Sequence, residues 1–351
     1  MSMGEKLKAP PIEARETRLD KQGDLLVHIA NDEENQFFLV DSHALSRVSG
    51  KWKPQIQELR DAHDRAQCTK LTISVQGRPD YHWLLFRIMH VDFECIPEEL
   101  SESQLFDLLS LTEEYQIRLS LLRPWMPMWI QPYKSLVGPG LHDAIRLYNR
   151  LWVAWVLGEV KKFHELLIVL VQDVVHGDGD GVLLNNGRSL PRSPEIPGLF
   201  SYLRRELESR VSQLLHVFER HLHIRNGPVQ YCKFAERPDT ERSMCDLIVS
   251  GSILRGYNRM VGPTGFDYRY MNVKATYDSL KTIKIYTYSC MPSDGAPAPP
   301  ACQTHEGLCN PTVVFHEAMG LIMEMKDLDH CFLQHLSRQA KLTGLERSMW
   351  D

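Results

Sequence analysis

Apolar and polar residues near the N-terminus alternate in short runs that are typical of β-strands. Residues 25–30 form an apolar run that ends at the acidic turn 31–34, and residues 36–40 form a second run directly after it, which predicts a β-hairpin. Hydroxyl side chains alternate with apolar ones in residues 70–75, which predicts a third strand. The polar composition of residues 1–20 predicts a disordered stretch before this small sheet.

Helical spacing replaces the strand pattern after residue 100. Ser101 and Gln104 have the spacing of a capping box, in which a hydroxyl binds a free backbone amide and the Gln side chain reaches back. A Leu-rich helix follows as far as Tyr115, and residues 117–128 predict a second helix whose prolines limit its regularity. Apolar residues at three- and four-residue steps predict further helices at residues 147–155, 163–174, 199–222, 244–260, 278–284 and 313–325.

Polar, Gly-rich and Pro-rich stretches separate these helices. Residues 176–197 predict a loop, Gly227 predicts the end of the long helix before it, and residues 292–300 predict a flexible linker. We therefore predict an α+β protein that is mostly α. It has a small N-terminal β-sheet with helical hairpins, followed by a mainly helical C-terminal extension.

Composition narrows the class of protein. The 351 residues suit about two domains of roughly 150 residues each. A net charge of −5 and scattered basic residues give no clustered basic face, so we expect no nucleic-acid partner. No run of about 18 apolar residues occurs, and residues 1–21 lack the apolar core of a signal peptide, so we expect neither a membrane span nor export. Eight irregularly spaced cysteines indicate reduced thiols. These features predict an intracellular protein, with nucleus and cytoplasm both open.

Several short motifs follow one another in a fixed order along the chain. They are Ser42, Leu45, Ser49 and Trp52 at the spacing S-x-x-L-x-x-x-S-x-x-W, then Ile88-Met89-His90, Ile96-Pro97, Trp129-Ile130, and Leu151 to Gly158 of the type L-W-x-x-W-V-x-G. Leu190-Pro191, Met244-Cys245-Asp246 with Gly251, and His305 with Cys309 continue the series. This order resembles that of BTB/POZ domain-containing proteins of the fungal type.

The resemblance implies a fold that binds proteins and carries out no chemistry. It implies a BTB/POZ domain at residues 21–130. The helical spacing described above predicts a helical region at 131–228 and a mixed helical C-terminal region with a Cys/His-containing loop at 229–351. The resemblance also implies protein partners, either this chain itself or the cullin scaffold of a ubiquitin ligase, for which the chain would be an adaptor. Asp41 and Ser42 stand where many animal BTB domains have a His and a basic residue, so the charged pocket and swapped dimer of that class are not implied.

One set of residues has the character of a metal site. Cys290, Cys302, His305 and Cys309 have the spacing C-x11-C-x2-H-x3-C, and three thiolates with one imidazole can hold zinc in a tetrahedron. The alternative is unliganded cysteines and a capping histidine. Zinc is the one cofactor that the sequence suggests.

Motifs for catalysis are missing from the sequence. It contains no G-x-S-x-G, P-loop, G-x-G-x-x-G or H-E-x-x-H, so we predict that the protein is not an enzyme. Two alternatives stay open: a zinc-stabilised regulatory protein, and a hydrolase or transferase with a dispersed site, which a deep pocket lined by paired ionisable groups would favour. Leu39, Val40, Leu45, Trp52, Trp152 and Trp155 are predicted to be core residues, and Tyr268 and Tyr270 to be the better contact candidates.

Overall fold

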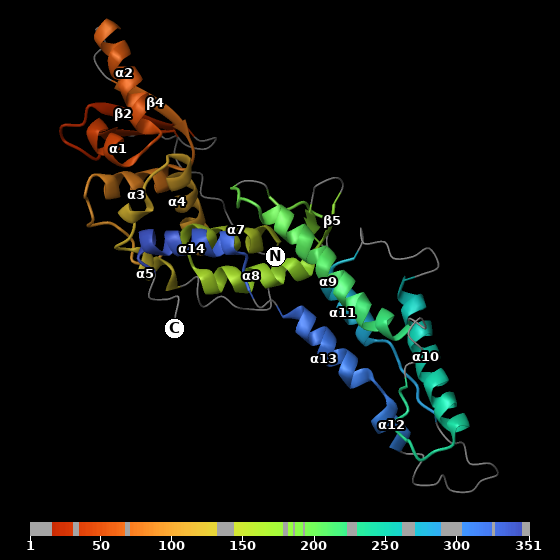
Figure 1. The fold of residues 1–351 in the computed structure, drawn as a ribbon. Coiled ribbons are helices and arrows are strands. Elements are labelled where there is room, and N and C mark those ends of the chain that lie inside the picture. The colour runs from red at the N-terminus through yellow and green to blue at the C-terminus, as the bar shows by residue number, and fades with distance from the viewer. Residues whose placement is uncertain are drawn as a thin grey trace, which may run out of the picture. The chain divides into compact units, whose positions relative to one another are not determined.

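The computed structural model describes residues 16–30, 35–66, 71–131, 144–177, 182–184, 187–191, 194–222, 230–261, 271–288, 304–324 and 327–345. The chain divides into two compact units, Met1–Phe163 with Asp329–Asp351 (unit 1) and His164–Leu328 (unit 2). The fold is α+β and mostly α, as predicted (Figure 1). The limits of the units differ from the predicted domain boundaries, but a compact unit can hold more than one domain, so those boundaries stay a prediction. No helix among the described residues has the length and apolar character needed to cross a membrane.

Unit 1 contains a four-stranded mixed sheet. Its strands are β1 (Glu16–Arg18), β2 (Leu25–Ala30), β3 (Asn35–Val40) and β4 (Leu71–Gln76), in the order β1-β3-β2-β4. Strands β2 and β3 form the predicted antiparallel hairpin, while β4 pairs with β2 in parallel and β1 pairs with β3 in parallel. Leu25, Val27 and Ile29 are buried at alternate positions of β2, so one face of the sheet contributes to the core.

Four helices follow the hairpin and complete this core. They are α1 (Ser42–Val48), α2 (Trp52–Ala66), α3 (Pro79–Met89) and α4 (Glu102–Glu114). The indole of Trp52 lies 5.3 Å from the ring of Phe86 and 4.5 Å from the ring of Tyr115, and Phe86 meets Phe38 of β3 edge to face. Aromatic side chains therefore connect α2, α3, the end of α4 and the sheet.

The serines of the S-x-x-L-x-x-x-S-x-x-W motif make long-range hydrogen bonds. The Ser49 hydroxyl donates to the carbonyl oxygen of Tyr115 over 2.6 Å and accepts from the backbone N–H of Trp52 over 3.0 Å. The Ser42 hydroxyl donates to the Asp24 carboxylate over 2.6 Å. Ser49 thus starts α2 and fixes it against the end of α4.

The later motif residues make similar contacts. The backbone N–H of Asp41 donates to Nε2 of His90 over 2.9 Å, so the end of α3 meets the start of α1. The indole N–H of Trp129 donates to the carbonyl oxygen of Pro97 over 2.8 Å. Trp129 ends the short helix α5 (Met126–Trp129) and is fully buried.

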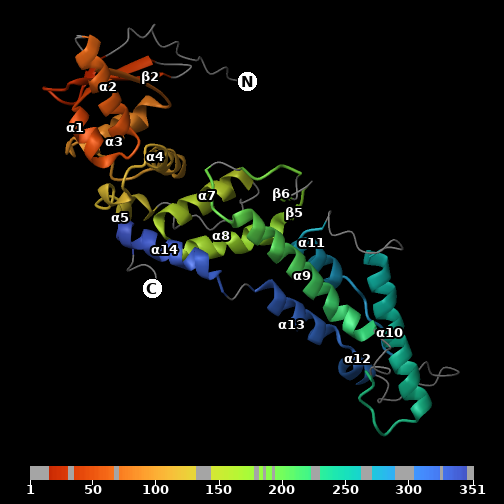
Figure 2. The ribbon, with the colours of Figure 1, turned by 45° about the horizontal axis from the view of Figure 1, so that its top comes forward.

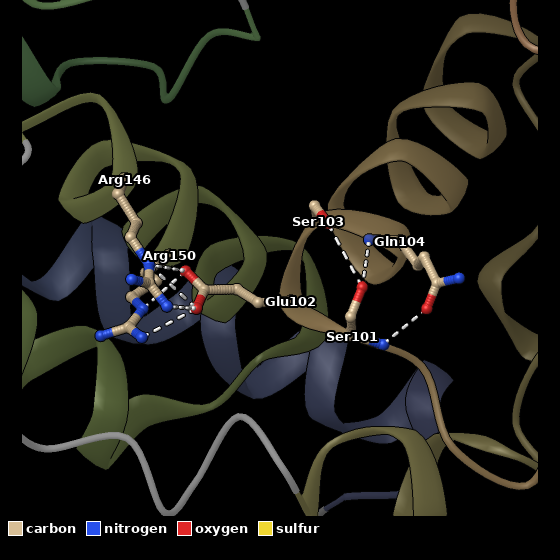
Figure 3. Close-up of polar contacts among 6 residues, drawn as sticks. All are labelled: Ser101, Glu102, Ser103, Gln104, Arg146 and Arg150. Atoms are coloured by element: carbon tan, nitrogen blue, oxygen red, sulfur yellow. Dashed lines mark hydrogen bonds and ion pairs between the residues drawn. The ribbon is translucent and has the colours of Figure 1, made fainter. Parts of the chain in front are cut away.

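An ion pair with several hydrogen bonds joins α4 to α7 (Ala144–Leu157) (Figure 3). The Glu102 carboxylate accepts from Arg150 at 2.6 Å and 2.7 Å and from Arg146 at 3.0 Å. Burial alone would raise the pKa of Glu102, but the hydrogen bonds from Arg150 and Arg146 outweigh burial and hold that pKa below its ordinary value. The capping box predicted at Ser101 and Gln104 lies beside Glu102 and is confirmed.

The last described helix, α14 (His330–Thr343), packs against α7. The Thr343 hydroxyl donates to the carbonyl oxygen of Leu157 over 2.8 Å, although 186 residues separate the two in sequence. The Trp155 ring stacks on His335 at 3.7 Å. A helix from the end of the chain therefore belongs to the same unit as the N-terminal sheet.

Unit 2 is built around α9 (Leu199–Leu222). Helices α10 (Asp239–Val261), α11 (Val273–Lys281) and α13 (Thr312–Met323) pack against α9 (Figure 2). Phe218 of α9 and Phe315 of α13 meet at 4.7 Å. Helix α8 (Val160–Asp173) runs across the limit between the units, and α12 (Thr304–Cys309) precedes α13.

The structure corrects three predictions about elements. Glu16–Arg18, inside the stretch predicted to be disordered, is strand β1, because β3 supplies its backbone partners. Residues 117–128 hold a 3-10 turn at Leu119–Leu121 and the start of the one-turn α5 instead of a continuous helix, since the prolines interrupt it. The predicted loop 176–197 contains β6 (Val182–Leu184), paired with β5 (Val174–His176). Gly227 and residues 292–300 lie outside the described residues.

Candidate functional site

The predicted zinc ligands are only partly visible. Cys290 and Cys302 lie outside the described residues, and so does the side chain of His305. Cys309 is described, at the end of α12, and 2 % of it is exposed. Only Cys309 of the predicted set can therefore be placed.

Cys309 lies close to two cysteines that are not among the zinc ligands predicted from the sequence. The sulfur atoms of Cys232, Cys245 and Cys309 all lie within 4.8 Å of one another, and all three residues are buried. Cys232 precedes α10 in a segment without helix or strand, whereas Cys245 lies on α10. We call this group the three-cysteine cluster. It is the one group of metal-ligating side chains found among the described residues.

Hydrogen bonds hold the backbone around the cluster. The Asp246 carboxylate accepts from the backbone N–H groups of Tyr231 and Cys232 over 2.7 Å and 2.8 Å, so the segment before α10 is fixed to that helix. The backbone N–H of Lys233 donates to Sγ of Cys309 over 3.4 Å. Three parts of unit 2 that are distant in sequence therefore meet through these contacts.

Burial makes the thiols of Cys245 and Cys309 less acidic. Burial raises the pKa of Cys245 to about 12, although a backbone hydrogen bond from Tyr288 acts in the opposite direction. Burial also raises the pKa of Cys309, and the neighbouring Cys232 raises it further. The cysteines are free of disulfide bonds. The cluster offers three sulfur ligands to a cation.

The sequence contains one local sign of the cluster. Cys245, Val249 and Ile253 are buried at four-residue steps on α10, so Cys245 lies on the face of the helix that packs inward. Cys232 shows no such sign, because its segment has neither a helical nor a strand pattern. Only the tertiary fold brings it to Cys245.

A second candidate site is a pair of exposed apolar residues in the loop after α3. Val91 and Phe93 are 66 % and 49 % exposed, and we call them the apolar loop surface. Val91 has φ +60°, a left-handed conformation that is rare for a β-branched residue. Phe93 packs edge-on against Trp125 at 5.1 Å, which holds this exposed ring in place.

The predicted core residues lie as expected. Leu39, Val40, Leu45, Trp52, Trp152 and Trp155 are all buried. Tyr268 and Tyr270, the predicted contact candidates, lie outside the described residues.

A surface hollow between α2 and β4 bears on the enzyme alternative. It has a volume of about 580 Å³, and its lining includes Lys51, Glu58 and Glu114. Lys51 and Glu114 form an exposed ion pair at 3.1 Å, a kind of contact that is common on protein surfaces. The hollow thus provides no specific support for catalysis, and the absence of activity stays a prediction.

Comparison of the chain with protein-family models, with curated proteins and with solved structures found no match.

Proposed function

We propose that this chain is a protein-interaction protein whose residues 21–130 form a BTB/POZ domain of the fungal type. The observation that carries the proposal is that motif residues behind the resemblance make hydrogen bonds to distant parts of residues 21–130. Ser49 binds the backbone of Tyr115 and His90 binds that of Asp41. If the chain shares the BTB/POZ fold, residues of its motifs should hold distant parts of the domain together, as Ser49 and His90 do.

The strand arrangement supports the same proposal. A hairpin, two helices and a strand parallel to its first strand follow one another in residues 25–76. The resemblance assigns all of these elements to one domain, residues 21–130. Because a fold alone does not establish a function, the surface has to supply the interaction.

The apolar loop surface is the part of unit 1 that suits a protein partner. Val91 and Phe93 expose two large apolar side chains within three residues of the chain, and exposed apolar surface is costly in water and marks contact sites. The strained backbone at Val91 adds to this, because such strain is retained where it presents side chains for binding. The partner that the resemblance implies first is a second copy of the chain, and the second is a cullin-type scaffold.

Sedimentation velocity of the full chain tests the proposal. We expect wild-type protein to form a dimer below roughly 100 µM, or to bind an added cullin N-terminal domain in that range. Phe93→Asp should weaken the association at least about 10-fold, because a carboxylate in an apolar contact must be desolvated.

The matched control is Leu342→Asp, which changes an exposed leucine of the same unit on α14. It should leave the association unchanged. A wild-type chain that stays monomeric at the highest concentration and ignores the scaffold would contradict the proposed function. Equal weakening by both variants would contradict the role of the apolar loop surface.

A further inference from the structure

We propose that Cys232, Cys245 and Cys309 bind one zinc ion, in a site that ties together the segment before α10, α10 itself and the end of α12. The proposal is independent of the interaction proposed for unit 1, since all three ligands lie in unit 2. It also differs from the set predicted from the sequence, with which it shares only Cys309.

The sulfur geometry suits a thiolate-bound metal. Zinc bonds thiolate sulfur at about 2.3 Å, so a tetrahedral site holds its sulfurs roughly 3.8 Å apart. The three sulfurs already lie within 4.8 Å of one another. Closing on an ion therefore requires each pair to approach by about 1 Å at most, which side-chain rotation can supply.

The surroundings supply the second feature of a metal site. Backbone N–H groups of Lys233 and Tyr288 donate to the sulfurs of Cys309 and Cys245. Amide hydrogen bonds of this kind stabilise the negative charge of thiolate ligands and orient them toward the metal. Asp246 holds the Tyr231 and Cys232 amides, so the first ligand is also oriented by a hydrogen-bonded backbone.

The local fold gives the ion a structural role. Residues 230–237 contain no helix or strand, and α12 has only six residues, so neither segment gains much stability from its own hydrogen bonds. A cation that links both segments to the long helix α10 would stabilise them by cross-linking. Binding is balanced as three thiols and one Zn²⁺ giving three Zn–S bonds and three released protons. A further donor or water completes the coordination.

Metal analysis and cobalt substitution of the full chain test the site. Purified wild-type protein should carry about one zinc per chain, and Co²⁺ added after chelation should give the sulfur-to-cobalt charge-transfer band and the strong visible bands of a tetrahedral thiolate site. Cys232→Ser and Cys245→Ser should each weaken binding at least about 100-fold, because each removes a direct ligand.

Two control variants separate this site from its competitors. Cys331→Ser changes an exposed cysteine and should bind as the wild type does. Cys302→Ser tests the set predicted from the sequence. Loss of metal in Cys302→Ser, together with full binding by Cys245→Ser, would overturn the proposal in favour of that set.

A measurement on the wild-type chain tests the site even if the cysteine variants fail to fold. Zinc should slow iodoacetamide modification of Cys232, Cys245 and Cys309, but not that of exposed Cys95, relative to protein kept in chelator. Unchanged modification rates, or wild-type protein that binds neither zinc nor cobalt under reducing conditions, would show that the cluster is only a group of buried thiols.

Discussion

Both the backbone conformation and a tertiary contact require glycine at position 158. Its φ is +78°, in the left-handed region, and a Cβ at this position would overlap the backbone nitrogen of Ala340 and the carbonyl oxygen of Leu336 on α14. Neither obstacle is the flexible end of a side chain. Only glycine allows α7 to end here while α14 passes so close.

Replacing Gly158 by alanine should therefore destabilise unit 1 strongly. We expect Gly158→Ala to lower the free energy of unfolding by roughly 2–5 kcal/mol, from the left-handed conformation and from overpacking against α14. Gly198→Ala is a matched control, because Gly198 has φ +77° and nothing within 4 Å of the added Cβ. It should cost only about 1–2 kcal/mol. Urea denaturation followed by circular dichroism measures both, and equal losses would show that α14 does not constrain Gly158.

A local sequence pattern explains only part of the role of Gly158. A glycine after an apolar helical stretch predicts the end of a helix from local pattern alone, and α7 does end at Leu157. The approach of α14 depends on residues 336–340, far along the chain, and α14 itself was not among the predicted helices. A close contact between two distant segments produces no repeating pattern in the sequence around either residue.

At the scale of elements, Glu102 is the main polar connection between α4 and α7. Its side chain is 14 % exposed and that of Arg150 is 6 % exposed, so their charges are poorly screened by water. Glu102→Gln removes the negative charge that two guanidinium groups face. We expect it to lower the free energy of unfolding by roughly 1.5–3 kcal/mol at pH 7.

The same variant has a defined pH dependence. The pKa of Glu102 is lowered in the folded chain, so its stabilising effect is fully present above the unfolded value of 4.5 and is lost as pH falls through the folded pKa. The stability difference between wild type and Glu102→Gln, measured by urea denaturation, should thus stay constant at neutral pH and shrink as the pH falls below 4.5. Glu114→Gln, which breaks the exposed pair with Lys51, is the control and should change stability by about 1 kcal/mol or less. A pH-independent difference for Glu102→Gln would contradict the role assigned to the charge.

Elements with a clear local pattern were predictable, whereas strand β1 depends on a distant partner. The hairpin of β2 and β3 follows from two runs and the turn between them, and the capping box at Ser101 follows from a four-residue pattern. Strand β1 has no strand signal of its own because it forms by pairing with β3. The three-cysteine cluster follows the same rule: Cys309 was selected for its neighbours in sequence, whereas Cys232 and Cys245 join it through the fold.

At the scale of the whole chain, unit 1 is built from two segments that are not consecutive in the sequence. Unit 1 takes its last helix from residues after 328, so the chain passes through all of unit 2 before it completes the first unit. The buried residues of α14, such as Leu336, therefore belong to the core of unit 1. Those of α13, such as Phe315, belong to the core of unit 2.

Two core substitutions close together in sequence should consequently destabilise different units. Leu336→Ala and Phe315→Ala each remove a buried side chain, at a cost of roughly 3 kcal/mol for the leucine and 4 kcal/mol for the phenylalanine. Hydrogen exchange followed by mass spectrometry should show faster exchange in α7 for Leu336→Ala and faster exchange in α9 for Phe315→Ala. This follows because α14 packs on α7, while α13 packs on α9. If Leu336→Ala accelerated exchange in α9 as much as in α7, α14 would not be part of a separate cooperative unit, and the division of the chain at Asp329 would be wrong.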